Sequence, residues 1–250
     1  MAQRPNRHKS VSKSNSIKYF LKEKGKIIMA GKKDIVEVKP VKVKETVVRI
    51  KGITPLIEHC WSEKAKKEML EKQMGTQDKS KTRDLKNPVE DFIRSMYWIT
   101  PMPTEFTEEA FEKAIDEGAR FGFPVSGVKQ AAISGAYRKK WVPDKMTLRG
   151  AFFIKPDAIA HEGTEVVEIF SDAPVMREDN VKVGMGTADL RYRGEFRNWY
   201  CDLKISYDAN GIYSIKDIIN YLNAAGFSVG IGEWRPERDG QNGMFEVATN

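Results

Sequence analysis

One helix in this sequence presents an apolar face that consists mostly of small residues. The helix lies in the segment FPVSGVKQAAISGAYRKKW, residues 123–141. Its apolar residues recur at the spacing of one helical face, and they are Val128, Ala131, Ala132, Gly135 and Ala136. Small side chains bury useful area only where another element approaches closely. The pattern therefore predicts a helix over 126–138 that packs at short distance against a second element.

The segments around this helix read as strands, and a second helix follows them. Residues 43–53 alternate Val or Ile with charged residues, as half-buried strands do. The second helix, 214–225, has Ser214 as its cap, and we expect Gly226 to end it. Strands are also predicted at 149–155, 198–207 and 243–248. The resulting order of strand, helix, strand, strand, helix, strand is that of a ferredoxin-like, or RRM-like, α+β fold.

Two stretches interrupt this predicted core. The first, 56–122, is polar and helical, with one helix capped by Asn87 and another capped by Thr107. The second, 157–196, is rich in Gly, Asp and Arg. We therefore expect a single domain over 34–250 with two insertions.

The basic charge of the chain is concentrated near its N-terminus. The formal net charge is +7, but residues 1–33 hold ten Lys or Arg and one Glu, which leaves the body with a net charge of −2. A tail of this composition lacks core-forming periodicity and is expected to be disordered. Alternatively, it is a translated leader that precedes a start at Met29. The net charge is thus a property of the tail.

Composition excludes several classes of protein. Two cysteines, Cys60 and Cys201, are too few for a disulfide framework or a structural zinc site. No apolar run approaches the length of about 20 residues that a membrane-spanning helix needs, and the N-terminus has no signal-peptide core. We expect reduced thiols, a cytoplasmic location, no bound metal and no membrane partner.

The start of the small-residue helix carries groups suited to an anion. Ser126 and Lys129 lie in its first turns, and helix N-termini present unpaired N–H groups with partial positive charge. Arg138 lies at the basic end of the same helix. The alternative is a capped core helix with a solvated basic end, and spacing alone leaves both open.

Five glycines stand in the connection before the last predicted strand, in AAGFSVGIGEWRPERDGQNGMFEV, residues 224–247. Glycines such as Gly230 and Gly232 let the backbone approach a ligand and expose N–H groups to an anion. Charge and a stacking face for a base come from Trp234, Arg235 and Arg238. The alternative is a mobile connection in which the tryptophan is core and the arginines pair with nearby carboxylates. In the ferredoxin-like topology this loop and the helix start share one edge of the sheet, so we expect them to converge.

A second basic and aromatic cluster is LRYRGEFRNWY, residues 190–200. Arg191 and Arg193 are interleaved with aromatic residues there, as expected where backbone charge and base stacking are both recognised. A strand with outward arginines and inward aromatics produces the same pattern.

Signals for catalysis are few. The GIG and GMG triplets are not a dinucleotide fingerprint, because neither follows a strand and opens a helix. His59 beside Cys60 has no identifiable third group, and a single loop histidine such as His161 is usually polar surface. We expect no catalytic residue and no cofactor.

The helix start and the glycine-rich loop resemble two motifs of the RAMP superfamily, the repeat-associated fold of CRISPR effector complexes. The first core helix of that family opens with Pro-Gly-Ser-Ser-Leu-Lys-Gly. Pro124, Ser126 and Lys129 fall on matching positions, whereas Val125 and Gln130 replace glycines. The stretch GFSVGIGEWRPERDGQNGMFEV is similar to the family's glycine-rich loop, although it is longer and contains acidic residues. Over most of its body the chain also resembles uncharacterised proteins of tailed bacteriophages.

This resemblance implies a modified RRM-like fold with a helical first insertion and a thumb-like second one. It is closest in layout to the backbone subunit that polymerises along a guide RNA. We therefore expect a phage protein of the bacterial cytoplasm that binds single-stranded RNA or DNA and self-associates into a helical multimer. Its candidate binding residues are Ser126, Lys129, Arg138, Arg191, Arg193, Gly230, Gly232, Trp234, Arg235 and Arg238. The alternatives are a phage protein-interaction module acting on host defence or replication, and a RAMP-type endoribonuclease using His161.

Overall fold

The structure is a computed structural model that describes residues 40–61, 63–75, 86–183 and 187–248, together with three short strands closer to the N-terminus. The chain divides into two units, Met1–Lys42 and Val43–Asn250. In the first unit the described strands form an antiparallel sheet in the order β1-β2-β3, and they are β1 (Phe20–Leu21), β2 (Ile27–Ala30) and β3 (Ile35–Glu37). Most of the predicted tail, 1–33, lies outside the described residues, so its disorder stays a prediction.

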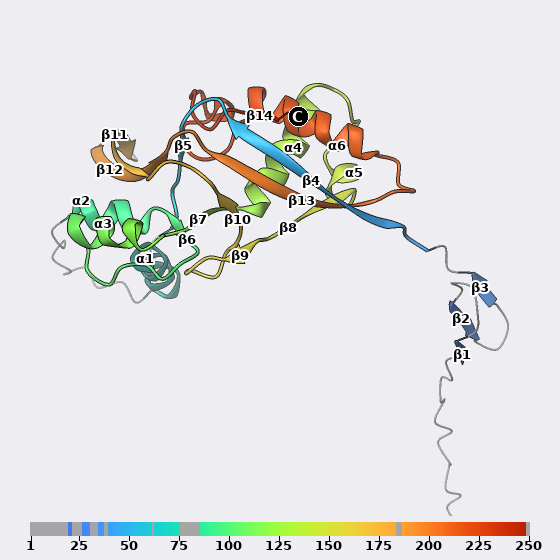
Figure 1. Cartoon of the computed structure of the whole chain (residues 1–250), viewed down its shortest axis with the longest axis horizontal. Helices are drawn as coiled ribbons and strands as arrows, with labels where there is room; N and C mark the ends of the chain where they lie inside the picture. The colour runs from blue at the N-terminus through green and yellow to red at the C-terminus, as the bar shows by residue number, and fades with distance from the viewer. Residues whose placement is uncertain are drawn as a thin grey trace, which may run out of the picture. The chain divides into compact units, whose positions relative to one another are not determined.

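The second unit is built on a four-stranded antiparallel sheet with the strand order β14-β4-β13-β8. Its strands are β4 (Val43–Gly52), β8 (Phe152–Lys155), β13 (Tyr200–Asp208) and β14 (Phe245–Val247). The two core helices are α4 (Val125–Arg138) and α6 (Ile215–Ser228). Along the chain the order is β4, α4, β8, β13, α6, β14 (Figure 1). The predicted ferredoxin-like α+β fold is confirmed, and each core element lies within a few residues of its predicted bounds.

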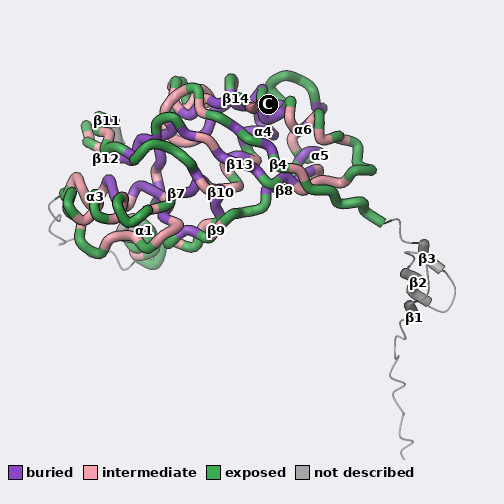
Figure 2. The backbone as a smooth tube through the Cα atoms, viewed as in Figure 1, coloured by how far each residue is buried: buried purple, intermediate pink, exposed green. Residues whose placement is uncertain are grey.

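One face of this sheet is buried and the other is not. Along β4, Val48 and Ile50 are buried while the alternate residues Val47 and Arg49 are exposed. β13 shows the same alternation, with Leu203 and its inward neighbours in the core. Period-two alternation places successive side chains on opposite faces of a strand, and Figure 2 shows buried and exposed backbone alternating through the sheet. The buried face packs into the hydrophobic core that α4 and α6 share.

The two core helices pack against each other at very short distance. A Cβ atom added to Gly135 of α4 would lie 2.7 Å from both Cα and N of Ala225 in α6. The predicted close approach of the small-residue helix is thus confirmed, and its neighbour is α6. Gly226 was expected to end α6, and that prediction is wrong: α6 continues to Ser228, and Gly226 is buried within it. A Cβ atom there would collide with the carbonyl oxygen of Phe245, so the absence of a side chain at Gly226 lets β14 pack closely against α6.

Among the described residues between β4 and α4, most of the regular secondary structure is helical. It contains β5 (Leu56–Ile57), α1 (Glu63–Met74), α2 (Pro88–Arg94), β6 (Tyr97–Trp98), α3 (Glu108–Asp116) and β7 (Phe121–Pro124). The predicted caps are present, because Asn87 accepts hydrogen bonds from Val89 and Glu90 N–H groups, and Thr107 accepts one from Ala110 N–H. Most of the polar linker between α1 and α2 lies outside the described residues.

The chain between β8 and β13 forms strands, of which the last two make a long hairpin. These strands are β9 (Ala158–Ile159), β10 (Glu165–Ile169), β11 (Val175–Val183) and β12 (Thr187–Phe196). They join strands of the first insertion in two sheets, β6-β7-β10-β9 and β11-β12-β5. The short helices α5 (Met146–Arg149) and η1 (Pro236–Arg238) complete the unit. Within the described residues, no helix has the length and hydropathy to cross a membrane.

We predict that Gly135→Ala destabilises the protein, because the added methyl group forces α4 and α6 apart. Overpacking of this kind costs about 1–3 kcal/mol, which exceeds the gain of about 0.5–1 kcal/mol that Ala has over Gly within a helix. Chemical denaturation measures the loss. The matched control is Gly150→Ala, since a Cβ atom at Gly150 meets no atom within 4 Å. Equal midpoints for both variants would contradict the close packing.

Candidate functional site

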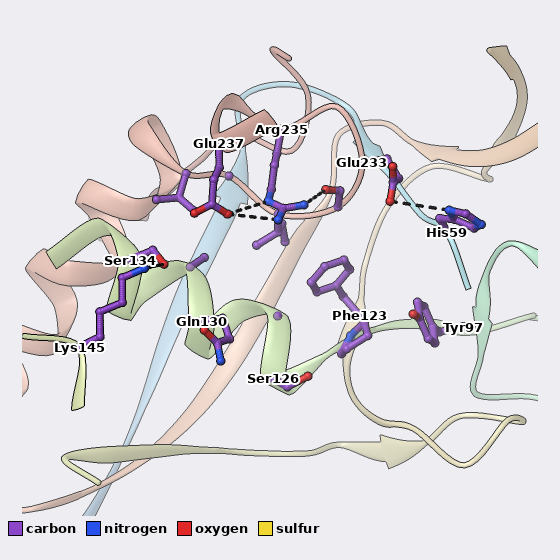
Figure 3. Close-up of a pocket in the computed structure, with 17 residues that line it drawn as sticks. His59, Tyr97, Phe123, Ser126, Gln130, Ser134, Lys145, Glu233, Arg235 and Glu237 are labelled. Atoms are coloured by element: carbon purple, nitrogen blue, oxygen red, sulfur yellow. Dashed lines mark hydrogen bonds and ion pairs between the residues drawn. The ribbon is translucent and has the colours of Figure 1, made fainter. Parts of the chain in front are cut away.

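A pocket of about 480 Å³ lies between the start of α4 and the loop that follows α6. Ser126, Gly127 and Gln130 line it from α4, and Gly230 and Gly232 line it from the loop. Figure 3 shows these two walls facing each other, with Arg235 and Glu237 on the loop side. The predicted convergence of the helix start and the glycine-rich loop is thus confirmed.

The glycines of this loop are required mainly by its own conformation. Gly230, Gly232 and Gly243 have positive φ angles of 69°, 77° and 64°, where residues with a Cβ atom are strained. The Gly230 N–H donates to Ala225 O and the Gly243 N–H donates to Pro55 O. The Gly232 N–H makes no hydrogen bond within the described part of the chain. The loop is therefore bonded to α6 and to the chain at Pro55, and the amide of Gly232 is left without a partner in the described chain.

A carboxylate stands between two arginines at the pocket. Arg235 donates to Gly232 O at 2.9 Å and to Glu237 Oε2 at 3.1 Å. Arg138, at the end of α4, donates to Glu237 Oε1 at 3.2 Å. Partial burial alone would raise the pKa of Glu237, but hydrogen bonds and charge from Arg235 and Arg138 hold that pKa below its ordinary value. The alternative in which loop arginines pair with nearby carboxylates therefore describes Arg235 correctly.

Trp234 and Arg193 meet at a shared acceptor, Asp179 of β11. The indole Nε1 of Trp234 and Nη1 of Arg193 both lie 3.1 Å from Asp179 Oδ2. Arg193 is 4% exposed, whereas Trp234 is 37% exposed and has a φ angle of 52°. Nη2 of Arg193 also lies 3.8 Å from Glu233 Oε2. Arg193 thus ties the hairpin to the loop from inside the protein, while Trp234 remains partly exposed.

The remaining candidate residues lie outside the pocket. Lys129 donates from Nζ to Arg149 O at 2.8 Å and lies over the Phe153 ring, and its burial lowers its pKa. Arg191 lies 3.4 Å from Asp189 in the hairpin. Arg238 is exposed on η1, beside the loop. The structure therefore brings Ser126, Gly230, Gly232 and Arg235 together, with Trp234, Arg238 and Arg138 next to them on the same loop or in contact with it.

Glu58, which the sequence analysis did not single out, is fully buried and directly precedes His59, which lines this pocket. Its Oε2 accepts a hydrogen bond from the N–H of Tyr97, a lining residue, and its Oε1 has no partner in the described chain. Burial raises the pKa of Glu58 well above its ordinary value. The sequence signal that could have identified Glu58 is its position directly after the apolar residues Leu56 and Ile57, both of which are buried.

The potentially reactive side chains considered in the sequence analysis are Cys60, His59 and His161. Burial raises the pKa of the Cys60 thiol to about 12, which keeps it protonated and unreactive. His59 Nδ1 lies 3.7 Å from Glu233 Oε1, and exposed His161 donates its backbone N–H to Trp98 O. Among the described residues, no three His, Cys, Asp or Glu side chains are grouped to hold a metal.

Comparison with known proteins finds a likeness in structure and none in sequence. No family model matches the sequence, and no curated protein sequence matches it. The crystal structure of Cmr6 from Pyrococcus furiosus superposes with a TM-score of 0.32 at 11% identity, covering 84% of this chain and 100% of that one. The fold assignment rests instead on the strand order and connections described above.

We predict that Glu58→Gln weakens the pH dependence of stability. Because the pKa of Glu58 is raised on folding, its contribution is fully present below the ordinary glutamate value of about 4.3 and is lost as pH rises above it, by about 1.4 kcal/mol per pKa unit. Glutamine stays neutral and keeps an acceptor for the Tyr97 N–H. Urea denaturation between about pH 5 and about pH 8 should show a smaller decline in the variant.

The matched control is Glu112→Gln, which makes the same change at an exposed position of α3. It should leave the wild-type pH dependence unchanged. If Glu58→Gln and Glu112→Gln follow the wild-type curve alike, Glu58 is ionised in the folded protein.

Proposed function

We propose that this protein binds single-stranded nucleic acid, RNA or DNA, at the pocket between α4 and the glycine-rich loop. The observation that carries the proposal is the meeting of an uncapped helix start with a loop that contains an unpaired glycine amide and a partly exposed tryptophan. Pro124 is the N-cap of α4, and no side chain caps the helix. The N–H groups of the first turn, at Ser126 and Gly127, are therefore available to a phosphate.

Trp234 supplies a stacking face for a base beside that phosphate site. Its ring is fixed by the hydrogen bond from Nε1 to Asp179, so little conformational freedom is lost when a base stacks on it. Stacking of one base on an aromatic side chain contributes about 1–3 kcal/mol and tolerates any sequence. We therefore expect binding without strong sequence preference.

The cations near the pocket are shared with carboxylates, which limits the affinity of one subunit. A phosphate that binds Arg138 or Arg235 replaces Glu237 as their partner, so the net electrostatic gain is small. Arg238 makes no ion pair among the described residues and contributes its full charge. Tight binding at physiological salt then requires several subunits on one strand.

We extend the proposal to a multimer assembled head to tail along the strand, as in a RAMP backbone subunit. In support, α1 exposes three apolar side chains, those of Met69, Leu70 and Met74. An exposed apolar surface suits contacts between copies, and contacts of the heterologous kind generate open helical assemblies. Membership of the RAMP superfamily and a phage origin rest on the sequence resemblance alone.

We predict opposite effects from two substitutions beside the pocket. Glu237→Gln should tighten binding of a short labelled oligonucleotide, because it frees Arg138 and Arg235 for phosphate. Arg238→Ala should weaken binding several-fold and lower the slope of log affinity against log salt by about 0.7, the value for one lost single-strand phosphate contact. Fluorescence anisotropy on the full chain at several salt concentrations measures both.

Lys113→Ala, at an exposed position of α3 away from the pocket, is the control for loss of one positive charge. The basic tail is present in every variant and contributes the same background. Binding that is equal in wild type, Glu237→Gln and Arg238→Ala would place the nucleic-acid contact outside this pocket.

The multimer predicts that binding stoichiometry rises with strand length. Light scattering on oligonucleotides of increasing length should show more chains on each longer strand. Leu70→Glu on α1 should reduce that number, whereas Gln73→Glu adds the same charge to the same helix without removing an apolar side chain. A single chain on strands of every length would end the multimer proposal and leave pocket binding standing.

A further inference from the structure

A second cavity, of about 510 Å³, lies where the helical insertion meets the start of β13. Ile115, Ala119 and Arg120 line it from α3 and the residues after it, and Phe170 and Tyr200 line it from the other side. None of these residues lines the pocket between α4 and the glycine-rich loop. The cavity is therefore a separate concave site.

Two stacked aromatic rings form one wall of this cavity. Phe170 and Tyr200 are directly opposite each other in an antiparallel bridge, with both backbone hydrogen bonds made, at 3.0 and 2.8 Å. Their ring centroids are 4.9 Å apart at an interplanar angle of 14°. Phe170 keeps 39% of its surface exposed, so part of this residue remains uncovered.

The Tyr200 ring is also in contact with an arginine of β4. The guanidinium carbon of Arg49 lies 4.4 Å from the Tyr200 ring centroid. Two hydrogen bonds of 2.7 Å to Asp202 fix its orientation. Tyr200 pairs with β4 through Lys51 and with Phe170 on its other side, so Arg49 and Phe170 flank the Tyr200 ring. The aromatic wall is thus a fixed stack whose free end is Phe170.

Polar groups surround the open end of the stack. Ser171, Asp172 and Asn198 line the cavity beside Phe170, and Asn198 Nδ2 donates to Asp172 Oδ2 at 2.6 Å. Arg120, also lining, is paired to Glu168 but half exposed. A nucleobase has a flat π face and an edge of hydrogen-bond donors and acceptors, and its phosphate is matched by a guanidinium. A flat ring with a polar edge and a cation near it suits such a ligand.

The geometry points to a nucleobase-binding site at this cavity, in which the base stacks on Phe170 and its edge meets Asp172 and Asn198. The base belongs to a free nucleotide or to a single strand, since the chemistry recognised is the same. The inference does not depend on binding at the α4 pocket.

Saturation-transfer NMR on the full chain tests the site, with AMP and UMP as probes. Ribose 5-phosphate tests for binding through phosphate alone, and glucose tests for a sugar site. Phe170→Leu keeps an apolar side chain but removes the flat ring, and should weaken nucleotide binding by about fivefold or more. Phe227→Leu is the matched control, because Phe227 is an exposed phenylalanine on α6 that lines neither cavity.

Nucleotide binding that is lost in Phe170→Leu and kept in Phe227→Leu supports the site. The inference is overturned if wild type binds neither nucleotide, if ribose 5-phosphate or glucose binds as well, or if both variants behave like wild type. A short oligonucleotide added to the AMP complex identifies the source: displacement of AMP indicates a base of the strand, and retention indicates a free nucleotide. If no oligonucleotide binds at all, the proposed function fails while the AMP result still decides this site.

Discussion

Gly135 of α4 meets the backbone of α6 at Ala225 with no room for a side-chain atom between them. That contact fixes where the start of α4 lies relative to the loop after α6. Gly226, one residue on, admits the carbonyl of Phe245 in the same way. The position of the pocket therefore depends on two glycines that do not line it: Gly135 sets helix against helix, and Gly226 sets helix against strand.

Asp179 holds the second set of constraints on the site. It accepts hydrogen bonds from Arg177, Arg193 and Trp234, so one buried carboxylate joins both strands of the hairpin to the glycine-rich loop. Removing either partner of a buried charge pair leaves an uncompensated charge, which is strongly destabilising. The orientation of Trp234 thus depends on a hairpin that belongs to an insertion, and the inserted segments position the site as much as the core does.

The core elements could be predicted from the sequence because the pattern that indicates each element lies within that element. The alternation along β4, the stripe of α4 and the Ser214 cap each lie within one element. The hydrogen-bond partners of the loop amides could not be predicted from the sequence, because they are distant along the chain. The N–H groups of Gly243 and Glu233 donate to Pro55 O and Ile57 O. For the same reason the sequence could not predict the sheets that strands of the two insertions share. Nor could it predict that Arg193 is buried, because the sequence around Arg193 matches that around an exposed arginine.

The place of β4 in the sheet has a consequence for synthesis. β4 is the first core strand to be made, yet it is central, and its neighbours β13 and β14 both come after the two insertions. Until they emerge, the apolar row that contains Val48 and Ile50 has no sheet to join. Pairing between segments so distant in the chain is slow, and an unpaired apolar strand is prone to aggregate. We therefore expect β4 to stay unpaired on the ribosome until most of the chain has been made, while its alternate charged residues discourage association.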